Sequence, residues 1–361
     1  MDRTFYLDMA AQGLAFPIGA DLVVHEAPDA RAIMLDGQKL GEAVAEAAKR
    51  YRAPVGFPLM DLGLEKNFLL KQFGIPDDRR DAYHFAACPS DEECQKALRG
   101  LAGALSPRMQ ATCKAIEYVA RRTTLAPMGM CIGPFSLTTK LLSDPITAVY
   151  LLGTGISAQE EPSIELARRM MSLACETIRT FIDAQIDAGA KAMIVCEPAA
   201  NKIYLSPHQL KPGMTLFDEV VMNNLRSLKQ RLDDRNVDLM LHNCGEIEAS
   251  MIGRFAELDP AILSLGSSRK LWEDAALTPK STVLYGNLPS KHFYSDAMIT
   301  RTQVVERSRD LRRRMKAIGH PFVLGSECDV LYVPGSVETI TDKVNAFVHD
   351  AAGGCACGAA H

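Results

Sequence analysis

Residues 237–245 read VDLMLHNCG, a short apolar run that passes into a polar turn. The run is too short for a helix of its own, and its apolar character predicts a buried strand. Gly245 gives the backbone freedom to turn immediately afterwards, and an amphipathic stretch follows over residues 246–258. A buried strand that leads through a polar turn into a helix is the repeating unit of a parallel α/β sheet.

The same unit recurs along the chain. Further short apolar runs, each ending in a polar or Gly/Pro-bearing turn, cover residues 54–60, 128–135, 192–197, 262–266, 282–286 and 322–325. Longer amphipathic stretches predict helices over residues 161–188, 215–234, 299–318 and 336–351. Seven strands, with room for an eighth, and no G-x-G-x-x-G after the first of them predict a closed (β/α)8 TIM barrel of the α/β class rather than an open doubly wound sheet.

The domain organisation follows from these elements. The chain is predicted to form a single TIM-barrel domain over residues 1–352. Residues 1–50 carry a helical pattern in their second half and predict an N-terminal helical extension that caps the end of the barrel. A second helical insertion is expected within residues 62–112. Neither segment is large enough to require a domain of its own.

Composition excludes several classes of protein. The 361 residues, of which 47% are apolar, are ample for a large buried core. The net charge of −4 at pH 7 provides no broad basic surface for nucleic acid or an anionic membrane. No segment reaches the ~18 consecutive apolar residues of a membrane span, and the N-terminus lacks the layout of a secretory signal. A cytoplasmic protein is therefore expected, and a homodimer stays open.

Cysteine is unusually frequent, with ten residues. Without an export signal a disulfide framework is disfavoured, so most of the thiols are expected to be small buried hydrophobes and a few to bind metal or act in catalysis. The terminal segment 353–361 carries Cys355, Cys357 and His361, which are ligand types for a soft metal. Because this segment is short and terminal, it is interpreted as a flexible tail.

Three of the metal-ligand residue types stand where predicted strands end. His242 and Cys244 are two positions apart in an extended chain, so their side chains project to the same side. Cys328 follows the strand predicted at 322–325 and reaches the same rim of a closed barrel. One imidazole and two thiolates favour Zn²⁺, and three protein ligands leave a fourth position for water or substrate, as in catalytic sites. Packing of buried His and Cys side chains, or a purely structural metal site, are the alternatives.

Three further polar residues at strand ends are candidates for the same site. Glu197 is predicted to be catalytic, either by completing the zinc shell or by handling a proton, with a loop hydrogen bond or a salt bridge as the alternative. Asp61 and Asn287 are predicted to bind substrate, although Asn287 is equally suited to cap a turn.

Five segments form a combination of motifs: 242–245 (HNCG), 325–329 (GSECD), 133–137 (GPFSL), 286–288 (GNL) and 60–65 (MDLGLE). Taken together, these motifs resemble the uroporphyrinogen decarboxylase superfamily over roughly residues 35–350. Within it the chain is most similar to the zinc methyltransferase branch typified by methylcobamide:coenzyme M methyltransferases. The resemblance implies a zinc ion on His242, Cys244 and Cys328. It also implies methyl transfer between a corrinoid (methylcobalamin) on a separate partner protein and a small thiol or an O-, N- or S-methylated small molecule.

The sister branch, which decarboxylates a polycarboxylate without metal, is the alternative. Its arginine-rich motif, similar to R-Q-A-G-R-Y, is missing, because residues 56–61 read GFPLMD, and residues 196–200 read CEPAA in place of its Asp-Ser-Trp-Ala-Gly-like element. Two loops also depart from the methyltransferase branch. Ser267 lies near a strand end that is often acidic, and Pro289 follows GNL where Asp-Pro is usual. These departures leave the substrate unassigned.

Overall fold

The computed structural model describes residues 1–211 and 213–350, so the predicted tail with Cys355, Cys357 and His361 lies outside the described residues. One parallel sheet runs through the chain in strand order β1-β2-β3-β4-β5-β6-β7. Each strand coincides with one of the seven predicted runs, which confirms the α/β prediction. The strands are β1 (Val55–Gly56), β2 (Ala126–Ile132), β3 (Ala192–Cys196), β4 (Asp238–Asn243), β5 (Ile262–Leu265), β6 (Val283–Leu288) and β7 (Phe322–Ser326).

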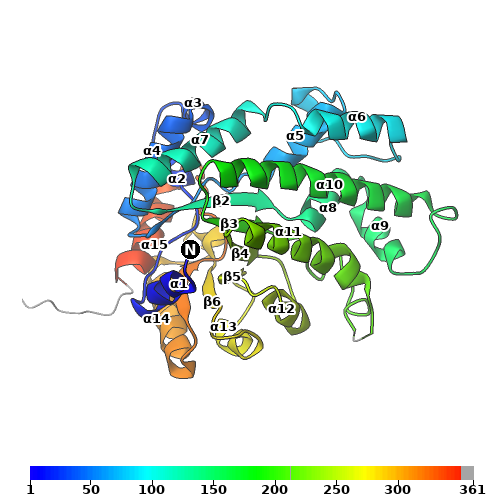
Figure 1. Cartoon of the computed structure of the whole chain (residues 1–361). Coiled ribbons are helices and arrows are strands. Elements are labelled where there is room, and N and C mark those ends of the chain that lie inside the picture. Colours follow the sequence, from blue (N-terminus) through cyan, green and yellow to red (C-terminus); the bar gives the residue numbers. More distant parts are fainter. Residues whose placement is uncertain (212, 351–361) are drawn as a thin grey trace, which may run out of the picture.

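The sheet curls into a half-barrel, and the predicted closed (β/α)8 barrel is therefore found only in part (Figure 1). The place of an eighth strand beside β7 is taken by the N-terminal segment 15–18, which forms two isolated parallel bridges, Ala15 to Leu324 and Ile18 to Asp329. Within the described residues no ladder joins this segment to β1. Pro17 lacks a backbone N–H, so a regular ladder cannot pass through it, and the Ile18 N–H donates to Ser326 Oγ (3.1 Å) instead.

Aromatic side chains fix the segment 15–18 between the two edges of the sheet. The ring of Phe16 lies 5.8 Å from that of Tyr285 in β6 and 5.9 Å from that of Phe57, which follows β1. The Tyr285 hydroxyl donates to the Phe16 carbonyl at 2.7 Å. Gly325 leaves the room for this ring, because a Cβ at residue 325 would lie 2.1 Å from Tyr285 Cζ. Side-chain packing thus fills the gap that backbone pairing leaves open.

Helices cover the outside of the sheet (Figure 1). The longest, α10, begins with Pro162, whose fixed φ suits the first turn, and its buried side includes Ile164, Met170 and Ile178. The predicted helices over 161–188, 246–258 and 299–318 are present with slightly different ends. The helix predicted over 215–234 opens with a π-helical turn (Asp218–Met222), and that predicted over 336–351 is α-helical to Asn345 and continues as a π-helical turn (Ala346–Asp350). The helices are α1 (Arg3–Ala11), α2 (Asp21–Val24), α3 (Ala30–Leu35), α4 (Gly37–Arg50), α5 (Leu64–Gln72), α6 (Asp91–Leu101), α7 (Pro107–Arg122), α8 (Pro134–Leu141), α9 (Pro145–Leu152), α10 (Pro162–Asp187), α11 (Asn223–Asp234), α12 (Ala249–Ala256), α13 (Leu271–Asp274), α14 (Arg301–Ile318) and α15 (Val337–Asn345).

The first helix, α1, lies at the amino ends of the strands. Its Tyr6 hydroxyl donates to Asp238 Oδ2 (2.8 Å) at the first residue of β4, and the terminal amine of Met1 bonds the same oxygen (2.7 Å). Arg3 pairs with Asp259 (2.8 Å), shortly before β5. The carboxyl ends of the strands, where barrels of this kind place their chemistry, lie at the other end of the sheet.

Two further observations concern the helices and the cysteines of the described residues. Within residues 1–211 and 213–350, no helix combines the length and the apolar character needed to cross a membrane. The eight cysteines in this part of the chain are all free thiols.

Candidate metal centre

His242, Cys244 and Cys328 come together at the carboxyl end of the sheet. His242 is the second-last residue of β4, Cys244 follows that strand directly, and Cys328 lies two residues beyond β7. Their potential ligand atoms all lie within 4.8 Å of one another, and the two Sγ atoms are 3.8 Å apart. Two sulfurs bound at ~2.3 Å to one tetrahedral ion lie about 3.8 Å apart. Among the described residues this is the one group of three or more His, Cys, Asp or Glu side chains with such spacing.

The imidazole of His242 is fully buried and oriented by one neighbour. Its Nδ1 lies 2.9 Å from Ser264 Oγ on β5, while Nε2 has no hydrogen-bond partner among the described residues. A proton on Nδ1 donated to Ser264 leaves the lone pair of Nε2 free. An unpartnered buried nitrogen costs about 1–3 kcal/mol, and a metal ion beside the two thiols would satisfy it. The ring therefore has the arrangement of a metal ligand with an outer hydrogen-bond partner.

The two thiols share one proton. The contact between their sulfurs lowers the pKa of Cys244 well below the usual range, against the effect of burial, and the same contact raises the pKa of Cys328. Lys291, in the 3-10 turn Ser290–His292 after β6, adds positive charge beside them. Burial alone would lower the pKa of Lys291, but the negative charge of Cys244 and Glu327 outweighs it and raises that pKa. The site therefore holds a thiolate at neutral pH, which is the form that binds metal.

Asn243, which lies between two of the candidate ligands, fixes the turn that carries Cys244. Its Nδ2 donates to the carbonyls of Glu197 (2.7 Å) and Ala200 (2.9 Å), and its Oδ1 accepts from the N–H of Gly245 (2.9 Å). All of this side chain is buried. No separate role for Asn243 or Ser264 could be predicted from the sequence, because both bond neighbours that are distant in the chain. Only their positions in the sequence could have indicated a role. Asn243 lies inside the HNCG motif, and Ser264 lies in the strand before the loop of Ser267.

Removing the partner of the imidazole is expected to weaken metal binding. In Ser264→Ala the Nδ1 proton loses its acceptor, so the ring and its tautomer are no longer fixed. Such outer partners typically contribute 10–100-fold in metal affinity, and a loss of that size is expected in zinc competition titrations against a chelator. Ser267→Ala, whose backbone N–H rather than side chain bonds Glu327, is the matched control and should bind zinc as the wild type does.

Glu197 is turned toward a helix rather than left free at the rim. Its two oxygens accept the N–H groups of Phe135 (3.2 Å) and Ser136 (2.5 Å) in the first turn of α8, and the side chain is fully buried. Burial raises the pKa of Glu197 to about 7, although both N–H donors act in the opposite direction. The geometry is that of the loop hydrogen bond considered as the alternative, and the catalytic role stays a prediction.

The two predicted substrate-binding residues also have partners within the chain. Asp61 contacts the guanidinium of Arg108 (3.5 Å) and accepts the Gly63 N–H (3.2 Å). Asn287 Nδ2 donates to the carbonyls of Gly266 (2.7 Å) and Arg269 (2.9 Å), which ties the end of β6 to the loop after β5. Asn287 lies at the carboxyl end of β6, whereas Asp61 lies in the loop after β1, and the contact of either residue with a substrate stays a prediction.

Comparisons with known protein families and solved structures identify the family of this chain. The sequence profile of the uroporphyrinogen decarboxylase (URO-D) family matches residues 84–351, which include all three residues of the His–Cys–Cys cluster. The chain belongs to the uroporphyrinogen decarboxylase family. Among solved structures it resembles a methyltransferase from Methanosarcina mazei, with 15% identity and a TM-score of 0.63 over 95% of this chain and 97% of that chain. No curated protein sequence matched. The superfamily predicted from the motifs is confirmed.

Glu65, the last residue of the MDLGLE segment, is a further buried carboxyl group in this uroporphyrinogen decarboxylase family member. Glu65 in α5 is 1% exposed, its Oε1 accepts the Ile132 N–H (3.1 Å), and its Oε2 has no partner among the described residues. Burial raises the pKa of Glu65 from 4.5 to about 8. The group is therefore protonated in the folded protein at neutral pH.

The free energy of unfolding should depend on pH through the titration of Glu65. Between pH 4.5 and about 8, Glu65 is protonated in the folded state and ionised in the unfolded state. Its contribution to stability is thus complete below pH 4.5 and is lost as pH rises through about 8. Glu65→Gln removes the titration while keeping the acceptor for Ile132. Over this pH range the free energy of unfolding of Glu65→Gln, measured by urea titration, should fall less steeply than that of the wild type. The two slopes should differ by at most ~1.4 kcal/mol per pH unit. Identical slopes would contradict the assignment.

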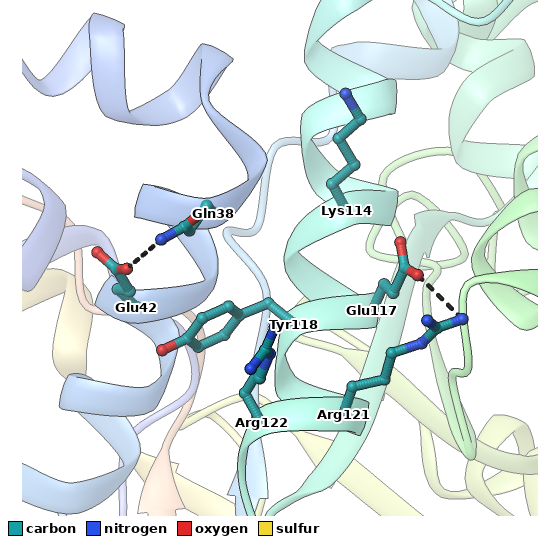
Figure 2. A pocket seen from close by; sticks show the side chains of 7 residues that line it. All are labelled: Gln38, Glu42, Lys114, Glu117, Tyr118, Arg121 and Arg122. Atoms are coloured by element: carbon teal, nitrogen blue, oxygen red, sulfur yellow. Dashed lines mark hydrogen bonds and ion pairs between the residues drawn. The ribbon is translucent and has the colours of Figure 1, made fainter.

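A separate groove of about 550 Å³ lies on the outer helices, between α4 and α7 (Figure 2). Two local pairs lie in it: Gln38 Nε2 donates to Glu42 Oε1 (3.0 Å), and Glu117 pairs with Arg121 (3.1 Å). Arg121 lies at the end of α7, a few residues before β2 starts. The groove is therefore near the amino end of the sheet, away from the His–Cys–Cys cluster, and belongs to the outer surface.

Proposed function

We propose that this protein is a zinc-dependent methyltransferase. It would move a methyl group between a corrinoid on a partner protein and a small thiol or a methylated small molecule. The observation that carries the proposal is the unpartnered, buried Nε2 of His242 beside two sulfurs 3.8 Å apart. The family match and the fold shared with a methyltransferase support it.

The chemistry assigns a role to each residue of the centre. Zinc held by His242, Cys244 and Cys328 would lower the pKa of a bound thiol and keep its sulfur nucleophilic. Two cysteine ligands bring negative charge, so the bound sulfur stays electron-rich. Ser264 holds the imidazole, and Asn243 holds the turn that presents Cys244.

Transfer to a thiol acceptor balances without a further reactant. The acceptor loses its proton to solvent, and its sulfur forms a bond to the methyl carbon. The bond between that carbon and cobalt(III) breaks, and its electron pair stays on the metal as cobalt(I). In the reverse direction, cobalt(I) attacks the methyl group of a donor whose heteroatom is polarised at the same centre. The residues present suit either direction.

Two measurements test the proposal on the purified full-length protein. Metal analysis is expected to find about one zinc per chain, as for a single catalytic site. Methylcobalamin mixed with a panel of thiols should lose its methyl group, followed by the change in its absorption spectrum, only when protein and a suitable thiol are present. A protein without bound metal that instead decarboxylates a polycarboxylate would favour the metal-free activity for which the family is named. Zinc without methyl exchange across thiols and methyl donors would favour a structural or storage site.

A further inference from the structure

The sulfur of Met60 faces the candidate metal centre. Its Sδ lies 3.6 Å from Cys328 Sγ. Met60 follows β1 and Cys328 follows β7, so the contact joins the loops at the two opposite edges of the sheet. Residue 60 lies before the segment that the family profile matches, and methionine was not among the residue types considered for metal binding.

The backbone holds this contact in place. The Met60 N–H donates to Asp329 Oδ2 (3.4 Å), and Asp329 is the residue directly after Cys328. Asp329 is 5% exposed, and it packs against the N-terminal segment so closely that a Cβ on Gly19 would lie 2.0 Å from its Oδ1. The loop of Met60 is therefore fixed to the loop of Cys328 by a buried carboxyl group, independently of the two sulfurs.

Three carboxylates near the rim, those of Glu197, Glu327 and Asp61, have partners elsewhere. Both oxygens of Glu197 accept N–H groups of α8. Glu327 Oε2 accepts the N–H of Ser267 (3.0 Å), and Asp61 is directed to Arg108 and Gly63. A carboxylate would have to leave these partners to reach an ion, whereas the thioether is already beside Cys328.

The spacing of the sulfurs suits a common ion. Cys328 Sγ lies 3.8 Å from Cys244 Sγ and 3.6 Å from Met60 Sδ. Both separations match the ~3.8 Å edge of a tetrahedral site with metal–sulfur distances of ~2.3 Å. Thioether sulfur is a soft donor of the kind that accompanies thiolates around soft ions.

We propose that Met60 Sδ is the fourth donor at this centre in the absence of substrate. The inference rests on the proposed zinc site and adds a neutral sulfur to His242, Cys244 and Cys328. Because a thioether is neutral and far less basic than an imidazole, it is the donor that an anionic thiolate displaces most readily. In the absence of substrate the protein then supplies all four donors. A thiol substrate takes the position that Met60 Sδ leaves.

The test compares Met60→Leu with Met171→Leu. Leucine keeps the approximate volume and apolar character of methionine but has no sulfur. Met171 is a partly buried methionine whose Sδ accepts a hydrogen bond from Thr138 Oγ1 (3.3 Å), so its replacement removes a comparable sulfur contact away from the cysteines. The zinc-loaded proteins are examined by X-ray absorption at the zinc edge, and the cadmium-loaded proteins by 113Cd NMR. Circular dichroism checks that both variants fold.

Met60→Leu should show one sulfur neighbour fewer than the wild type, replaced by nitrogen or oxygen, and an upfield 113Cd resonance. Zinc affinity should fall roughly tenfold, on the scale of lost metal-site partners, while Met171→Leu should match the wild type. Zinc-edge spectra of Met60→Leu and wild type that coincide would overturn the proposal. A wild-type spectrum with only the two cysteine sulfurs would do so as well, even if Met60→Leu failed to fold. A wild type that retains no zinc would refute the proposed function itself.

Discussion

Cys328→Ala is expected to lower zinc affinity by more than ~100-fold and to abolish methyl transfer. The substitution removes a thiolate donor, an effect larger than the 10–100-fold that follows from losing a mere outer partner. His242 and Cys244 remain, with only the neutral thioether of Met60 beside them, and a site left with a single thiolate holds zinc poorly. The fold should persist, since Cys328 is only partly buried and lies in a loop after β7. Metal analysis after dialysis against a chelator, with the methylcobalamin assay, measures both effects.

The control for this variant is Cys175→Ala. Cys175 is also a partly buried free thiol, and its Sγ contacts Asn224 (3.4 Å) between α10 and α11 rather than another cysteine. It should keep wild-type zinc content and activity. If Cys328→Ala also kept stoichiometric zinc, the assignment of the centre would be wrong, whatever the activity showed.

The sequence allowed the sheet and the cluster to be predicted because both depend on local patterns. Each strand is a short apolar run with a clear end, and parallel strands bring their carboxyl ends to one edge. His242 and Cys244 are two residues apart, and Cys328 stands after another strand, so strand assignment alone was enough to bring them close.

What escaped prediction depends on contacts that periodicity does not encode. The segment 15–18 is short and contains Pro17, so it has no strand signature, and its place beside β7 is set by the packing of Phe16 against Tyr285. Ser264 becomes important only because β4 and β5 pair in a register that sets it opposite His242. The sulfur contact of Met60 requires the two edges of the sheet to meet, which no linear pattern reveals. The direction of the Glu197 carboxylate was undecided for the same reason.

Glu197→Ala is expected to destabilise the protein by about 2–6 kcal/mol, because it leaves two buried N–H groups without acceptors at about 1–3 kcal/mol each. These are the N–H groups of Phe135 and Ser136 in the first turn of α8. No local side chain can replace the carboxylate, since the helix starts after Gly133, where a Cβ would lie 2.1 Å from Glu197 Oε2.

Glu197→Gln separates this structural role from a catalytic one. The glutamine keeps one acceptor oxygen but sets an NH₂ group against the second N–H, so about half of the destabilisation is expected. Urea denaturation measures both variants, and zinc content is determined on the folded protein. If Glu197 acts only through α8, the folded fraction of each variant keeps its zinc. The loss of stability is then smaller for Glu197→Gln than for Glu197→Ala. A variant of normal stability that loses zinc or activity would instead place Glu197 at the metal centre, as its position at the end of β3 first indicated.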